Sequence, residues 1–308
     1  MTPNQEINVV KRCGESTPLD LDKIHKMVQF ACEDLAGVSE SQVEMNANLQ
    51  FFDGIQTADI QEILIRSAND LISLENPNYQ FVAARLLLFG LKKAVYNGDH
   101  PDKNPVLLDH VKRCVERGVY DGSIIEKYNE EEWEELNRFI DHSRDFNFTY
   151  AGMRQVCDKY LVQDRSTGEI FETPQYMYIM IAATLFQNDD KFYRLDYVRK
   201  YYNAISKQRI NIPTPIMAGV RTPIRQFASC VLVDIDDTLD SIFSSDMAIG
   251  KYVAQRAGIG INAGRIRGIN SKIRGGEVQH TGVVPFLKKF ESTVRSVSYT
   301  HLTLPTKA

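Results

Sequence analysis

The pattern of apolar residues changes once along the chain, near Ile210. Before this point apolar side chains recur mainly every three or four residues, the period of an α-helix. After it, a β-prone run at 229–234 and a glycine-rich run at 258–264 flank a helical run at 239–252. Alternating strands and helices are typical of a parallel α/β domain, but the stretch is far shorter than the roughly 200 residues of a full barrel. The sequence therefore predicts a helix-rich α/β protein whose α/β domain is incomplete.

The first 97 residues form a predicted compact unit of one hairpin and four helices. Two β-prone stretches flank a turn at Gly14, which predicts the hairpin. Asp20 and Thr57 are the kinds of residue that cap helices, and each precedes a run with helical spacing. The four helices are expected from Leu21 to about Gly37, from Ser39 to Phe51 after which residues 52–56 turn, from Thr57 to about Leu71, and from Pro77 to Tyr96.

Residues 97–105 are rich in turn formers and predict a linker to a helical stretch that reaches about residue 207. Within it, residues 160–163 and 169–172 are expected to form a hairpin. Long amphipathic helices are expected at 173–186 and 191–206. The acidic run at 130–135 is interpreted as a solvated helix face rather than as a binding site.

Composition excludes several classes of protein. The chain is 43% hydrophobic and 25% charged, with a net charge of −4, which argues against a nonspecific nucleic-acid binder. No apolar run is long enough for a membrane helix, and the first residues lack the pattern of a secretory signal, so a cytoplasmic protein is expected. The five cysteines are far apart and never in a C-x-x-C pair, which disfavours a zinc site and a disulfide scaffold, and no metal site is predicted.

Three features bear on chemistry, and each has an ordinary structural alternative. The glycines at 258, 260 and 264 follow a predicted helix rather than a strand, so they are not a dinucleotide fingerprint; they fit a close backbone approach instead. Cys230 lies in an apolar strand, where an inert core thiol is the default. The constrained segment before it, 213–223, is nevertheless a reasonable wall for a ligand. Arg267 and Arg274 flank a glycine-rich turn and suit phosphate binding, although alone they are a weak signal.

Several motifs taken together resemble the large (alpha) subunit of class Ia ribonucleotide reductases. The resemblance covers about residues 7–296, and its last motifs are long and specific. The matching segments are VKR at 10–12, LDKIH at 21–25, FDGIQTADI at 52–60, AARL at 83–86, PTPIMAGVRTP at 213–223, QFASCVL at 226–232, QRAGIGINAGRIR at 255–267 and IRGGE at 273–277.

The resemblance implies an architecture. Residues 1–97 would be an ATP-cone, an allosteric domain that distinguishes activating ATP from inhibiting dATP. Residues 98–209 would be the helical N-terminal domain, 210–296 the first part of a ten-stranded α/β barrel, and 297–308 an unrelated tail, because the likeness stops after about Ser296.

The resemblance also implies three nucleotide sites. The activity site would hold ATP or dATP through Lys11, Thr17, Pro18, Leu19, Asp20, Leu21, Asp22, Lys23, Thr57 and Lys93. The specificity site would hold a deoxynucleoside triphosphate at a dimer interface through Asp237, Thr238, Leu239, Arg267 and Arg274. The substrate site would hold a ribonucleoside diphosphate through Thr214, Ser229, Cys230 and Gly258, with Cys230 as one of two cysteines that reduce the ribose.

The expected partners follow from the same resemblance. They are a second alpha subunit, a radical-generating di-iron beta subunit, and thioredoxin or glutaredoxin as reductant; no covalently bound cofactor, nucleic acid or membrane is expected. The second reducing cysteine and the thiyl cysteine of the family have no counterpart here, so the hypothesis is that this chain alone has no reductase activity. The alternatives are a nucleotide-sensing regulator built on an ATP-cone, although such proteins carry zinc-ribbon cysteines that are lacking here, and a helical interaction module.

Overall fold

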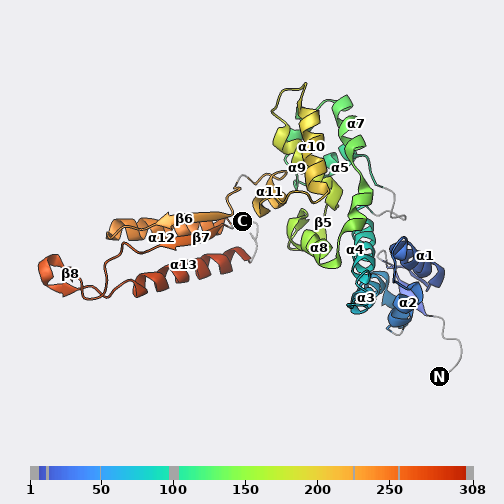
Figure 1. Ribbon diagram of the computed structural model, residues 1–308, viewed down its shortest axis with the longest axis horizontal. Helices are drawn as coiled ribbons and strands as arrows, with labels where there is room; N and C mark the ends of the chain where they lie inside the picture. The colour runs from blue at the N-terminus through green and yellow to red at the C-terminus, as the bar shows by residue number, and fades with distance from the viewer. Residues whose placement is uncertain are drawn as a thin grey trace. The chain divides into compact units, whose positions relative to one another are not determined.

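The computed structural model describes residues 7–11, 14–48, 50–96, 104–224, 226–255 and 257–302, with side chains described up to Val297 (Figure 1). The chain divides into two compact units. The first consists of residues 1–212 and 220–223, and the second of residues 213–219 and 224–308. Most of the predicted linker, 97–103, and the end of the predicted tail, 303–308, lie outside the described residues.

The first unit begins with a three-stranded sheet in the order β2-β1-β3. β1 (Asn8–Val10) pairs antiparallel with β2 (Ser16–Pro18), which confirms the predicted hairpin. β1 also pairs in parallel with β3 (Ile55–Gln56), a strand that falls in the predicted turn at 52–56. With only two residues, β3 has no alternation to reveal it, and only its pairing with β1 makes it a strand.

The four helices predicted for this region are present. The Asp20 side chain caps the first by accepting from the backbone N–H of Lys23 at 3.1 Å. The expected cap at Thr57 is wrong, because Gln56 occupies the N-cap position without a side-chain cap bond and Thr57 is the first helical residue. The helices are α1 (Leu21–Cys32), α2 (Glu40–Asn48), α3 (Thr57–Asp70) and α4 (Tyr79–Tyr96).

Helix α4 is shared between the N-terminal helices and the helical segment that follows. It packs against α1 and α3, and also against η1 (His142–Asn147) and α8 (Tyr150–Gln155). The Phe89 ring lies 5.3 Å from that of Phe30 on α1 and 6.4 Å from that of Phe146 on η1. Residues on both sides of the predicted boundary at 97 therefore contribute to one continuous core.

The helical segment departs from prediction in two places. The helix expected at 173–186 is present as α9, but it is buried on all sides from Pro174 to Ala183 and is not amphipathic. The acidic run lies on α7 and is mostly solvated, but Glu132 turns inward and pairs with buried Arg194. The elements are α5 (Leu107–Glu116), α6 (Ser123–Lys127), α7 (Glu130–Phe139), η2 (Val156–Tyr160), the predicted hairpin β4 (Gln163–Asp164) and β5 (Glu169–Ile170), α9 (Pro174–Phe186) and α10 (Arg194–Ser206).

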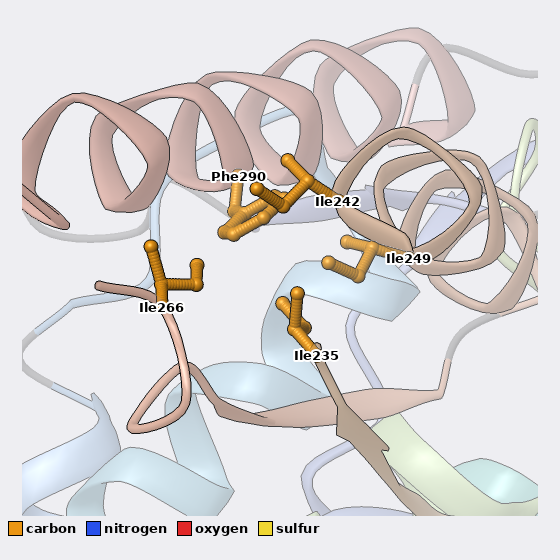
Figure 2. Packing of buried hydrophobic residues seen from close by; sticks show 5 residues of the cluster. All are labelled: Ile235, Ile242, Ile249, Ile266 and Phe290. Carbon is orange, nitrogen blue, oxygen red and sulfur yellow. The ribbon is translucent and has the colours of Figure 1, made fainter. Parts of the chain in front are cut away.

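The second unit is built around a parallel pair of strands with a helix between them in sequence. β6 (Cys230–Asp234) pairs with β7 (Gly258–Asn262), and the intervening helix α12 (Leu239–Ala254) packs on both strands and on α13 (Val284–Leu302). Five buried residues from the loop after β6, α12, the loop after β7 and α13 form its core, as Figure 2 shows: Ile235, Ile242, Ile249, Ile266 and Phe290. The described strands close no barrel, as expected of an incomplete α/β domain.

The remaining elements of this unit are short. They are α11 (Thr214–Gly219), the hairpin β8 (Lys272–Ile273) and β9 (Val278–Gln279), and η3 (Arg274–Gly276) between those strands. Residues 274–276 form a tight 3₁₀ turn in which all three have positive φ. Glycine tolerates that conformation without steric cost, which accounts for the Gly275-Gly276 pair. Helix α13 runs through the predicted border at 297.

Candidate functional site

The sheet of the first unit brings Lys11 and Thr57 to the same end. Val10 lies opposite Gln56 in the parallel register, so the residues that follow each strand are neighbours. Lys11 forms an exposed ion pair with Glu15 at 3.0 Å. Thr57 is the first residue of helix α3, and the Gln56 side chain at the N-cap accepts no hydrogen bond from the first N–H groups of that helix. Free N–H groups at a helix N-terminus beside a lysine form a suitable environment for a phosphate.

The other residues expected at the activity site lie farther along the hairpin. β2 runs antiparallel to β1, so the segment from Leu19 to Lys23 leaves from the opposite end of the sheet. At about 3.3 Å per residue the two ends are separated by roughly 7–10 Å, a distance that an extended nucleotide spans. The backbone N–H of Lys23 lowers the pKa of the Asp20 carboxyl. Lys93 is exposed in the last turn of α4 and has no hydrogen bond to Lys11 or Thr57 in the described part of the chain.

A cavity of about 300 Å³ lies between helices α3 and α4 on one side and α8, η2 and the β4–β5 hairpin on the other. Gly90 and Gln61 line it, and the Arg154–Glu62 ion pair at 2.6 Å joins two of its walls. None of the residues predicted for nucleotide binding line this cavity. No local sequence pattern predicts this cavity, because its lining comes from five elements spread over residues 58–170.

Four of the five residues expected at the specificity site gather at the start of α12. Asp237 accepts from the Arg267 backbone N–H at 3.0 Å and from its Nε at 2.7 Å. The backbone bond lowers the pKa of Asp237, and the guanidinium adds to this effect. Thr238 caps α12 by accepting from the Ser241 N–H at 3.1 Å, and Leu239 beside it is 63% exposed. Arg274 lies in the β8–β9 turn, where no described hydrogen bond joins it to Asp237.

The strand pair brings three of the four predicted substrate residues together. Cys230 lies opposite Gly258, and the Gly258 N–H donates to the Ser229 carbonyl at 2.8 Å. A Cβ at position 258 would lie 3.3 Å from that oxygen and 3.6 Å from the Cys230 Sγ, so the glycine permits this close approach. Thr214 begins α11 in the same unit and has no hydrogen bond to Ser229 or Cys230 in the described part of the chain.

Cys230 differs from the other described cysteines. Its side chain is exposed, whereas Cys32, Cys114 and Cys157 are buried. Burial raises the pKa of the Cys32 thiol to about 11 and that of Cys114 and Cys157 to about 12, so these three are protonated and shielded at neutral pH. The default interpretation of Cys230 as an inert core residue is therefore wrong, and it is the accessible thiol of the described residues.

A polar group that the sequence analysis missed lies at the carboxyl ends of β6 and β7. The Asn262 Nδ2 donates to Asp234 at 2.8 Å, and Arg265 forms an ion pair with Asp234 at 3.0 Å. The signal was available, because each strand ends on a polar residue and carboxyl ends of parallel strands commonly border binding sites. Among the described residues no group of side chains has the composition of a metal site, and no helix has the length and apolar character needed to cross a bilayer.

Comparison with known proteins divides the chain into three matched regions. Residues 7–94 match the ATP cone domain, residues 146–225 the all-alpha domain of ribonucleotide reductase, and residues 228–301 the barrel domain of ribonucleotide reductase. The last match extends past the predicted end of the likeness at Ser296.

Individual relatives match almost the whole chain. Subunit alpha of ribonucleoside-diphosphate reductase 1 from Escherichia coli is 52% identical over 295 residues, which are 96% of this chain and 38% of that protein. The alpha subunit from Haemophilus influenzae is 51% identical over 96% of this chain and 39% of its own length, and that of enterobacteria phage T4 is 46% identical over 96% and 38%. The chain thus spans less than two fifths of the length of these relatives. It belongs to the ribonucleoside-diphosphate reductase alpha-subunit family.

Proposed function

We propose that this chain supplies the nucleotide-sensing region and one wall of the active site of a class Ia ribonucleoside-diphosphate reductase, an enzyme that makes deoxyribonucleotides for DNA synthesis. The observation that carries the proposal is the exposed Cys230 thiol on strand β6, opposite the side-chain-free Gly258. A rigid strand holds the sulfur in place, and the glycine leaves room for a ribose close to the backbone. Ser229 and Thr214 complete the proposed contacts to the nucleoside diphosphate.

In the proposed reaction, a thiyl radical elsewhere in the enzyme removes the 3′ hydrogen atom of the ribose and later returns it. Cys230 gives its proton to the 2′ hydroxyl, which leaves as water. Cys230 and a second cysteine together supply two electrons and two hydrogens and end as a disulfide, so a nucleoside diphosphate and two thiols give a deoxynucleoside diphosphate, water and the disulfide. Thioredoxin or glutaredoxin then restores the thiols by thiol–disulfide exchange.

Two effector sites belong to the same proposal. ATP or dATP would bind the cone, with its phosphates at Lys11, Lys93 and the N-terminus of α3 and its remainder along residues 17–23. A deoxynucleoside triphosphate would bind beside Asp237, Thr238 and Leu239, with phosphates at Arg267 and Arg274. The Asp237–Arg267 contact supports this site, because it holds both groups at the start of α12 before an effector arrives. A coupling of about 1–3 kcal/mol between sites suffices for regulation.

The partners and location are proposed from family membership. They are a second alpha subunit, a beta subunit that provides the radical from a di-iron centre, and the cytoplasm as the compartment in which reduced thiols persist. By itself, the 308-residue chain is expected to form no dCDP with a matching radical subunit and a dithiol, since no residue of it matches the thiyl cysteine.

The proposal is tested by alkylating the thiols of the chain with and without CDP and counting modified sites by peptide mass spectrometry. Cys230 should react faster than Cys32, Cys114 and Cys157, and CDP should slow its alkylation severalfold, whereas cytidine, which lacks the diphosphate, should slow it less. The buried thiols provide the internal control. Equal alkylation of Cys230 with and without millimolar CDP would overturn the proposed substrate site.

A further inference from the structure

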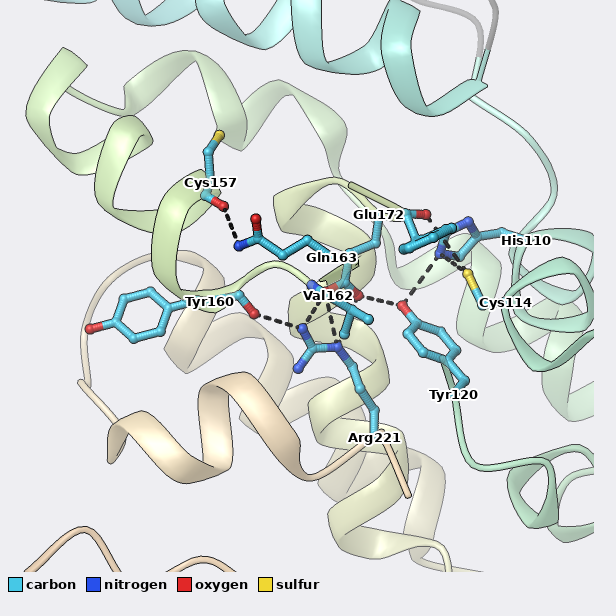
Figure 3. A network of polar contacts seen from close by, with 10 residues as sticks. His110, Cys114, Tyr120, Cys157, Tyr160, Val162, Gln163, Glu172 and Arg221 are labelled. Carbon is cyan, nitrogen blue, oxygen red and sulfur yellow. Dashed lines mark hydrogen bonds and ion pairs between the residues drawn. The ribbon is translucent and has the colours of Figure 1, made fainter. Parts of the chain in front are cut away.

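A buried ion pair in the first unit is not explained by the proposed reaction. Glu172, just after strand β5, and Arg221, in the segment before β6, are each 0% exposed through their side chains. Arg221 donates to the Glu172 carboxylate through Nε at 2.9 Å and also through Nη2 (Figure 3). Its Nη2 further donates to the Tyr160 carbonyl at 3.0 Å.

The carboxylate is satisfied from several sides. The backbone N–H of Val162 donates to Glu172 at 2.6 Å, and the Tyr120 hydroxyl donates to its other oxygen. His110 lies behind Tyr120, where burial and the nearby arginines lower its pKa to about 3, so its ring is neutral. Burial alone would lower the pKa of Arg221, but the Glu172 carboxylate outweighs it and raises that pKa, so the Arg221 guanidinium stays charged.

Such a pair is a poor source of stability. Removing two charges from water costs several kcal/mol per ion, and apolar residues of similar volume often stabilise a core as well or better. A fully hydrogen-bonded buried pair instead fixes one arrangement of the segments that it joins, because any displacement leaves a charge without its partner. The segments joined here come from residues 120, 160–162, 172 and 221.

The position of Arg221 in the chain indicates which segment the ion pair holds in place. Residues 220–223 belong to the first unit, whereas residues 213–219 before them and 224 onward belong to the second. Val220, Arg221 and Thr222 are buried, and the Arg221 carbonyl accepts from the Asp121 N–H at 2.9 Å. Thr214 lies on the segment that enters this anchor, and Ser229 and Cys230 lie on the segment that leaves it.

We infer that Glu172 and Arg221 are positioning residues that anchor residues 220–223 in the first unit and so fix the points from which both substrate-binding segments depart. Neither side chain touches the substrate. This role rests on the proposed function, because it matters for catalysis only if Thr214 and Cys230 contact the nucleoside diphosphate. The anchor itself is a property of the fold and is measurable without a nucleotide.

Hydrogen exchange of the wild-type chain tests the anchor directly. Amides of Arg221 and Thr222 should exchange as slowly as those of α9, and at least about tenfold more slowly than those of residues 213–218 and 226–229. Exchange at Arg221 and Thr222 as fast as in the flanking segments would overturn the anchor.

The positioning role is tested by Arg221→Lys, which keeps the charge but loses the two-pronged contact. The matched control is Arg194→Lys, because Arg194 is 3% exposed and contacts Glu132 through Nε and Nη2 but lies on α10. Arg221→Lys should raise exchange severalfold in both flanking segments and abolish the protection of Cys230 by CDP. Arg194→Lys should change neither the exchange of these segments nor the protection of Cys230. Equal effects of the two substitutions, or no effect of Arg221→Lys, would refute the positioning role of Arg221.

Two further measurements distinguish a failure of the anchor from a failure to fold and from a failure of the proposed function. Should Arg221→Lys fail to fold, Tyr120→Phe removes a single hydroxyl from Glu172 and should produce the same changes to a smaller degree. Should CDP fail to protect Cys230 even in the wild type, the proposed function fails. The exchange pattern of residues 213–229 still decides whether residues 220–223 are anchored.

Discussion

At the scale of single residues, Asp145 is a carboxyl whose ionisation is opposed by its surroundings. Its side chain is fully buried on η1, where one oxygen accepts from Gln175 Nε2 at 2.7 Å and the other has no partner among the described residues. Burial raises its pKa to about 7, although the Gln175 bond and the charge of Lys92 oppose the shift. A carboxyl that is ionised in the unfolded chain is therefore largely protonated in the folded one below neutral pH.

The difference between the folded and unfolded pKa of Asp145 predicts that Asp145→Asn stabilises the protein by an amount that depends on pH. The folded pKa lies above the unfolded value, so the contribution of Asp145 to stability is fully present below about pH 4 and is lost as the pH rises to about 7. A neutral amide avoids this loss of stability. The free energy of unfolding of the variant should therefore equal that of the wild type near pH 4 and exceed it at pH 8 by up to about 4 kcal/mol. Urea unfolding at several pH values measures the difference. Asp158→Asn, at an exposed position, should show no such trend, and a pH-independent gain at Asp145 would contradict the explanation.

At the scale of elements, the β6–β7 pairing decides how the Cys230 thiol is presented. The two strands are parallel and in direct register, and Gly258 lies opposite Cys230. The glycine has no side chain to occupy the space in front of the sulfur, and its N–H bonds to Ser229. Strand pairing and thiol exposure are therefore linked at one position.

The substitution Gly258→Ala is expected to disturb both the pairing of β6 with β7 and the exposure of the Cys230 thiol. The new Cβ would lie 3.3 Å from the Ser229 carbonyl oxygen, which is backbone and yields only if the strands shift. We expect a loss of about 1 kcal/mol from the second unit and slower alkylation of Cys230. Gly268→Ala is the control, since nothing lies within 4 Å of the added atom. Identical unfolding midpoints and alkylation rates for the two variants would argue against a role for the close approach.

Much at this scale was predictable from the sequence, and the exceptions share a cause. The hairpin, the helices near their observed bounds and strand β6 follow from periodicity and caps, which are local signals. Strand β3 was missed and α9 was wrongly expected to be amphipathic, because pairing with β1 and burial on every side are set by distant residues. Glu132 was predicted to be solvated for the same reason, since only the fold brings Arg194 beside it.

At the scale of the whole molecule, each of the two units has a hydrophobic core of its own. The second unit is centred on the cluster in Figure 2, and the first contains the long buried helices α4 and α9. Because the two cores are separate, the two units need not unfold together in one cooperative transition. The proposed effector sites divide between the units, with the cone in the first and the site at α12 in the second.

The division predicts separate responses to the two effectors. A ligand stabilises the unit that binds it, by about 2.7 kcal/mol at a concentration of one hundred times its dissociation constant. In calorimetry of the chain, dATP at low concentration should raise the melting temperature of the first unit, and dTTP that of the second. Peptide-resolved hydrogen exchange assigns each shift to its unit. The proposed sites would be contradicted if dTTP protected only residues of the cone, or if neither nucleotide changed either transition.

The sequence by itself determined the family, the order of the helices and strands, and the motifs at 213–232 and 255–277, because these depend on residue type and spacing along the chain. Only the tertiary structure decided that Cys230 is exposed, that Asp237 accepts hydrogen bonds from Arg267, and that Glu172 and Arg221 meet in a buried core. Burial and ion pairing depend on which segments meet in space. Glu172 and Arg221 are 49 positions apart, so no local sequence pattern predicts their contact.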